Sequence, residues 1–183
     1  MKRTTLTNHI SAFQTEAMML LRFQFAFKRL LKFDRINEMT RSEVVDRLIS
    51  LKAIENDMLI RVCKFDDDTK GVHSFTEALK EIPTTHPKKT EIEKEVKQFS
   101  KQIENIKKQR RHTQLAHLKI GIEDNDYDVR YNFTPAIKSI INIIDLMNMT
   151  EVSYKWSDGR YEKFDLRQEV LNKPLIDKEK SSR

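Results

Sequence analysis

Arginine and histidine side chains gather in one short stretch of this chain, from Arg110 to His117. Histidine can donate or accept a proton near neutral pH, and arginine can hold a phosphate that gains negative charge in a transition state. Together these two residue types can cleave RNA without a metal ion. Residues 105–119 also hold five basic residues and no acidic ones, which favours a phosphate backbone as the partner: Lys107, Lys108, Arg110, Arg111 and Lys119.

A helical pattern leads into this stretch. We expect it to start near residue 90, where Thr90–Glu93 form a capping box, and its apolar residues step by four and three: Ile92, Val96, Phe99, Ile103 and Ile106. The same rhythm continues into Arg110, Thr113 and His117. Positions 110 and 117 would point nearly the same way, because seven residues turn a helix by about 700°. A buried charge is costly, so the change from aliphatic to cationic residues predicts a cleft or an interface, unless the helix ends near Gln109.

Composition predicts an all-α fold. The 183 residues can form one well-buried core, and 3 glycines and 4 prolines against 34% charged residues favour long helices. The single cysteine, Cys63, excludes an internal disulfide framework and fits a reducing cytoplasm. The apolar run from Ala17 to Phe27 is too short to span a bilayer, so we expect a cytoplasmic protein without membrane contact. The net charge of +6 admits a polyanionic partner, although scattered lysines often form only a solvated face.

Hydrophobic periodicity predicts a compact bundle of four main helices. The first covers about residues 7–33, the second starts at 40, the third follows a loop with two prolines, and the fourth starts at 134. The second begins at a capping box, Thr40–Glu43, and is broken by Asp66–Asp68, which we interpret as a solvated helix end rather than a cation site. Thr134 and Pro135 predict the N-cap and first turn of the fourth helix.

Two features extend beyond a simple bundle. Phe23 and Phe25 widen the apolar face of the first helix, which indicates either a partner surface or a helix buried on two sides. After Thr150 the sequence alternates as in a strand up to Asp158–Gly159, a favoured hairpin turn, and residues after about Leu171 are charged. We therefore predict a helical bundle over residues 1–150, and a hairpin-like appendage with a mobile tail over 151–183.

The remaining histidines and Cys63 suggest no further chemistry. His9 falls in the N-terminal turn of the first helix, and His73 and His86 fall in loops. None has a partner at metal-ligand spacing, so we expect neither a metal nor another cofactor. Cys63 is expected to be a small buried hydrophobe.

The segment from Arg111 to His117 resembles the signature of HEPN domains: an arginine, a polar residue, a short spacer, then Ala116 and His117. The acidic break after the second helix and the isoleucine-rich fourth helix are similar to the branch associated with abortive phage infection. The resemblance covers residues 40–150. It implies a helical bundle that dimerises and acts as a metal-independent ribonuclease, in a toxin–antitoxin or antiviral system.

If the segment cleaves RNA, the ribose 2′-hydroxyl attacks the adjacent phosphorus and leaves 2′,3′-cyclic phosphate and 5′-hydroxyl ends. His117 would transfer a proton, and Arg111 would hold the non-bridging phosphate oxygens. His112 would orient the phosphate or supply a second proton-transfer group. Further contacts to RNA would come from the neighbouring basic residues Arg110, Lys107, Lys108 and Lys119. The family pattern selects Arg111 as the catalytic arginine, whereas helical geometry selects Arg110 as the one that faces His117.

A complete site needs both an acid and a base, while the motif supplies one well-placed histidine per chain, so we expect a homodimer. Some HEPN toxins are silenced by modification of a tyrosine two residues after the histidine. Here that position is Lys119, so an antitoxin protein would mask the site by binding. Two other functions remain open: a HEPN module that binds RNA or nucleotides without cutting, and a helical protein that binds a partner through its first helix.

Overall fold

The computed structural model describes residues 5–32, 36–113, 132–156 and 164–172, with the backbone alone for residues 108–113 and 164. Four long helices dominate these residues, as the sequence predicts: α1 (Leu6–Leu30), α2 (Arg41–Lys64), α4 (Lys89–Thr113) and α5 (Thr134–Asn148). The shorter elements are a 3-10 turn η1 (Ile36–Glu38), α3 (Phe75–Glu81), β1 (Lys155–Trp156), β2 (Phe164–Asp165) and α6 (Leu166–Leu171). The predicted all-α fold is confirmed. None of the described helices is long and apolar enough to cross a membrane.

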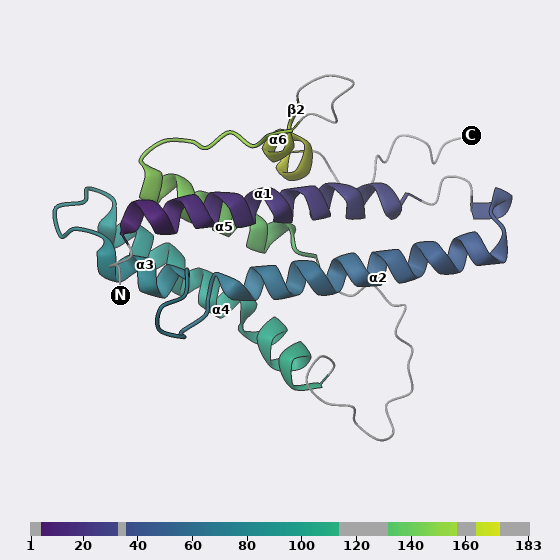
Figure 1. Ribbon diagram of the computed structural model, residues 1–183, viewed down its shortest axis with the longest axis horizontal. Coiled ribbons are helices and arrows are strands. Elements are labelled where there is room, and N and C mark those ends of the chain that lie inside the picture. Colours follow the sequence, from purple (N-terminus) through teal and green to yellow (C-terminus); the bar gives the residue numbers. More distant parts are fainter. Residues whose placement is uncertain (1–4, 33–35, 114–131, 157–163, 173–183) are drawn as a thin grey trace.

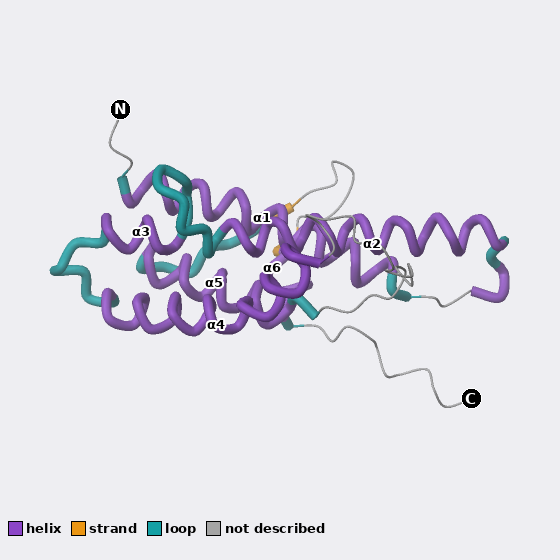
Figure 2. Tube along the Cα trace, turned by 90° about the horizontal axis from the view of Figure 1, so that it is seen from below, coloured by secondary structure: helices purple, strands orange, loops and turns teal. Residues whose placement is uncertain are grey.

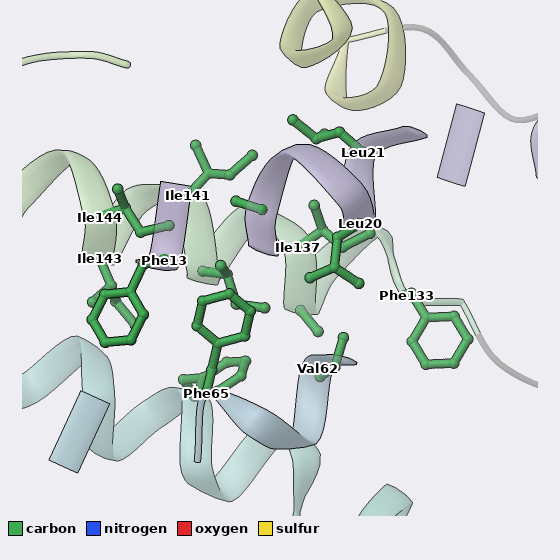
Figure 3. Packing of buried hydrophobic residues seen from close by; sticks show 14 of the residues in the cluster. Phe13, Leu20, Leu21, Val62, Phe65, Phe133, Ile137, Ile141, Ile143 and Ile144 are labelled. Carbon is green, nitrogen blue, oxygen red and sulfur yellow. The ribbon is translucent and has the colours of Figure 1, made fainter. Parts of the chain in front are cut away.

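Helix α1 lies at the centre of the arrangement. It runs antiparallel to α2 and also packs against α3, α5 and α6, while α4 pairs with α5 (Figures 1 and 2). The core forms where these helices meet, and Phe13, Leu20, Phe65, Ile137 and Ile144 are each at most 2% exposed (Figure 3). Burying such side chains contributes roughly 1.5–3 kcal/mol each.

The ends of the helices match the sequence in part. The capping box at the start of α2 is confirmed, because the Thr40 N–H donates to Glu43 Oε2 at 2.7 Å and the Glu43 N–H donates to Thr40 Oγ1 at 3.3 Å. The predicted capping box at Thr90 is wrong: α4 already starts at Lys89, so Thr90 lies inside its first turn. Thr134 is the first residue of α5 rather than its N-cap, and its N–H donates to Asn132 Oδ1 at 3.1 Å.

The wide apolar face of α1 is covered within the chain. The Arg61 guanidinium from α2 lies 5.2 Å from the centre of the Phe23 ring. Phe25 meets Trp156 of β1 edge to face, with ring centres 6.1 Å apart. A helix buried on two sides therefore accounts for these phenylalanines, and they do not require a partner surface.

Described residues from the C-terminal part of the chain belong to the same core as the bundle. β1 and β2 pair antiparallel, with Trp156 opposite Phe164, whereas the predicted turn at Asp158–Gly159 lies outside the described residues. After β2 the chain forms α6, which the sequence did not predict, and the Lys28 ammonium of α1 donates to the Val170 carbonyl at 2.5 Å. Leu166 and Val170 are fully buried. Residues 151–156 and 164–172 thus pack against the bundle, and the predicted mobile tail after residue 172 lies outside the described residues.

A second short helix, α3, was also missed. It lies in the stretch that the sequence assigned to a loop between the second and third helices. The Ser74 hydroxyl accepts from the Glu77 N–H at 3.4 Å, and Phe75 and Ala78 are buried in the core. A helix of seven residues is unstable alone, so its contacts with α1 and α4 hold it in place.

Candidate functional site

The arginine and histidine segment begins on the last turn of α4. This helix continues to Thr113, so the alternative of a helix end near Gln109 is wrong, and Arg110, Arg111 and His112 all have helical backbone. The C-terminal end of α4 lies below α2 in the view of Figure 1. His117 and Lys119 lie outside the described residues.

Helical geometry places Arg110 and Arg111 on different faces of α4. Arg110 follows the buried Ile103 by seven residues and Ile106 by four, so it lies on the face that packs into the bundle further up the helix. Arg111 lies about 100° further round. The described helix therefore leaves open which arginine works with His117.

Arg111 lies at the C-terminal end of a basic face on the outer side of α4, which the sequence analysis missed. Lys97 and Lys101 are exposed, and positions 97, 101, 108 and 111 share one side of the helix opposite its buried residues. Glu104 interrupts this face. We name these four positions the basic face of α4: Lys97, Lys101, Lys108 and Arg111. The helical period of the lysines was the signal that could have identified it.

Lys107, expected to bind RNA, has a structural partner. Its ammonium lies 2.5 Å from Asp66 Oδ2 and 2.7 Å from the Asp66 carbonyl, and the Ser100 hydroxyl donates to the other carboxylate oxygen. Asp66 follows α2, so these bonds attach the last turns of α4 to the end of α2. The interpretation of the acidic run as a solvated helix end is therefore wrong for Asp66. An RNA contact from Lys107 stays a prediction, and it would compete with this ion pair.

Two histidines for which the sequence suggested no chemistry lie in contact with each other. His9 in the first turn of α1 is 2% exposed, and its Nδ1 is 3.2 Å from Nδ1 of His73 in the loop before α3. One of these nitrogens must carry a hydrogen and the other must accept it. Burial, and then the charge of His73, lower the pKa of His9, while Glu81 and Glu77 act weakly in the opposite direction.

A hollow of about 340 Å³ opens beside His73, between α1 and the end of α2. The Phe13 and Phe65 rings lie against each other there, with centres 5.6 Å apart. Glu16 at the rim already accepts from Arg61 at 2.7 Å and from Lys64 at 3.4 Å. None of the described residues that line the hollow is a serine, threonine or cysteine, so the hollow fits an apolar group better than a nucleophilic reaction.

The described residues hold no cluster of three or more histidine, cysteine or carboxylate side chains that could bind a metal ion. Cys63, the single cysteine of the chain, is half-buried and packs against the core. No protein-family model, curated protein or solved structure matches this chain. The resemblance to HEPN domains therefore depends on the motif at the end of α4 and on the helical pattern around it.

Proposed function

We propose that this protein is a metal-independent endoribonuclease of the HEPN type. It would act in the cytoplasm as a toxin or an antiphage effector. The observation that carries the proposal is the position of Arg111, on the last turn of α4 at the end of its basic face. Lys97 and Lys101 on that face are exposed, so the phosphate backbone of an RNA can follow the helix towards the arginine and histidine segment.

In the proposed reaction, one histidine removes the proton of the ribose 2′-hydroxyl, and the resulting oxygen attacks the adjacent phosphorus. The bond from phosphorus to the 5′-oxygen breaks, and a second histidine donates a proton to the leaving oxygen. Arg111 holds the non-bridging oxygens as their negative charge grows. His117 is assigned to proton transfer, and His112 orients the phosphate or supplies the second proton-transfer group.

A homodimer completes the proposed site, because a second copy of the chain brings a second His117. Both copies of the arginine and histidine segment would then line one composite site at the subunit interface. An antitoxin protein would silence it by covering that interface. Lys119 in place of a tyrosine argues against silencing by tyrosine modification at this position.

Cleavage of end-labelled total RNA in EDTA tests the proposal. The wild type should cut and leave 2′,3′-cyclic phosphate ends, while Arg111→Ala and His117→Ala should each lose at least about 100-fold in rate. Arg22→Ala, a matched loss of one exposed arginine on α1, should cut like the wild type. Including Arg110→Ala decides which of the two arginines is catalytic.

Other outcomes support the two alternative functions. RNA binding that weakens with salt, without cleavage by any variant, identifies a non-catalytic binding module. If the protein neither binds nor cuts RNA, the enzyme proposal is wrong and a helical partner-binding protein remains. In a His117→Ala background, the pair Lys97→Gln and Lys101→Gln should reduce the salt dependence of RNA binding by about 0.7 per lysine in the log–log slope.

A further inference from the structure

Helix α2 carries an apolar stripe that faces solvent. Val45, Ile49 and Ile60 are 39%, 49% and 48% exposed, although large aliphatic side chains usually lie in the core. They share one side of the helix with three smaller side chains, at successive spacings of three, four, four, three and four residues. We name this set the α2 stripe: Ser42, Val45, Ile49, Ala53, Asn56 and Ile60. The opposite side of α2 packs into the core through Leu51, Met58 and Val62.

The half of α2 that carries Val45 and Ile49 lies outside the main bundle. It extends beyond α3, α4 and α5, with the C-terminal part of α1 beside it (Figures 1 and 2). None of residues 41–50 is buried. Arg47 nevertheless attaches this half of the helix to α1, because its guanidinium donates to the carbonyls of Leu30 and Lys32 at 2.7 Å each. The stripe is therefore presented on a helix that is held in place.

Opposite charges line the two edges of the α2 stripe. Arg41 and Lys52 lie along one edge, and Asp46 and Asp57 lie along the other. Arg41 precedes Asp46 by five residues, and Lys52 precedes Asp57 by five residues. Because five residues turn a helix by about 500°, the two members of each pair lie on opposite edges of the stripe and cannot form an ion pair with each other. Lys52 pairs with Glu55 and Asp57 pairs with Arg61, whereas Arg41 and Asp46 form no ion pair with another described residue.

This charge pattern selects one orientation for a second copy of the helix. If two α2 helices pack in parallel about a twofold axis along their length, the basic edge of each copy faces the acidic edge of the other. Arg41 then meets the partner's Asp46 in both directions. In an antiparallel pair the basic edge of one copy would face the basic edge of the other, and the acidic edges would face each other, so like charges would repel.

We propose that the α2 stripe is the contact between two copies of this chain, with their α2 helices parallel. The stripe runs for about 27 Å, from Ser42 to Ile60, which fits a modest dimer interface. Asn56 lies within it, is half-buried, and has a side-chain amide that can both donate and accept hydrogen bonds. Two facing Asn56 amides can satisfy each other, as asparagines do at the contact of parallel coiled coils, and this pairing fixes the register.

The proposal takes from the proposed function only the expectation of a homodimer. Its test measures the oligomeric state of the full chain by sedimentation, so its failure is distinguishable from an absence of RNA cleavage. The wild type should be dimeric at about 100 µM, and Ile49→Asp should weaken the dimer at least about tenfold while keeping the wild-type helical circular dichroism. Met149→Asp, which changes an equally exposed apolar residue at the C-cap of α5, should leave the dimer unchanged. A wild type that stays monomeric, or an Ile49→Asp protein that dimerises equally well, overturns the proposal.

Two further variants test the orientation. Arg41→Asp should weaken the dimer, and Arg41→Asp with Asp46→Arg should restore it, because the two edges exchange their charges. In a Cys63→Ala background, Ser42→Cys should form a disulfide with its own counterpart on mild oxidation, since parallel helices bring equal positions together. No restoration by the double variant, or no crosslink at position 42, overturns the parallel arrangement.

Discussion

Replacing Asp66 by alanine should detach the last turns of α4 from the end of α2. The Asp66 carboxylate accepts from the Lys107 ammonium at 2.5 Å and from the Ser100 hydroxyl, and both donors belong to α4. Asp66→Ala removes both bonds. Lys107 keeps one acceptor, the carbonyl of residue 66 at 2.7 Å, so its charge is not left without a partner.

The size of the effect follows from the burial of the pair. The side chains of Lys107 and Asp66 are 26% and 14% exposed. A solvated ion pair contributes about 0–1 kcal/mol, while breaking a fully buried one costs about 3–5 kcal/mol. For this intermediate case, we expect the free energy of unfolding to fall by about 1.5 kcal/mol. With a urea dependence of about 2 kcal/mol per molar, the midpoint of unfolding drops by about 0.7 M.

Asp68→Ala is the matched control, because Asp68 belongs to the same acidic run and is exposed. Its midpoint should stay within about 0.2 M of the wild type. A double-mutant cycle with Lys107→Ala should give a coupling of about 1 kcal/mol between residues 66 and 107. Equal midpoints for Asp66→Ala and Asp68→Ala would refute the reasoning, since the contact with α4 would then contribute nothing.

Three other substitutions test separate contacts by urea unfolding. Burial and the charge of His73 lower the pKa of His9, so the unfolded chain binds a proton at this histidine more readily than the folded chain does. The free energy of unfolding should therefore fall as the pH drops from about 7 towards the lowered pKa. His9→Gln should reduce this pH dependence. Arg47→Ala should cost about 2 kcal/mol through the lost bonds to the end of α1, whereas Arg41→Ala should cost less than about 0.5 kcal/mol. Met149 has a left-handed backbone with φ of 61°, so Met149→Gly should stabilise the protein by about 0.5–1 kcal/mol and Met149→Ala should not.

The long helices could be predicted because their signals are local. The apolar spacing of α4 and α5 and the capping box at Thr40 depend on residues within a few turns of each other. The short helices α3 and α6 could not, since neither is stable without its neighbours. α6 depends on Leu166 and Val170 packing against α1, more than a hundred residues earlier in the chain.

The candidate site, too, could be predicted only where its features are local in the sequence. The residue types from Arg110 to His117 are visible in the sequence, and the helix that carries the first of them was expected. The partners of Lys107 and of His9 were not, because Asp66 lies 41 residues from Lys107 and His73 lies 64 residues from His9. Spacing along the chain contains no information about such contacts. They exist because α2 and α4, and α1 and the loop before α3, pack together.

The central place of α1 also affects how this chain is synthesised. α1 is made long before its partners α5 and α6, which begin only at Thr134 and Leu166. During translation the apolar side chains of α1 must therefore wait for most of the chain to leave the ribosome, and they are open meanwhile to chaperones and to aggregation. A fragment that stops before Thr134 would lack the partners that cover this helix. The core around α1 should consequently be completed only once α6 has been synthesised, and chains truncated before α6 should be targets for degradation.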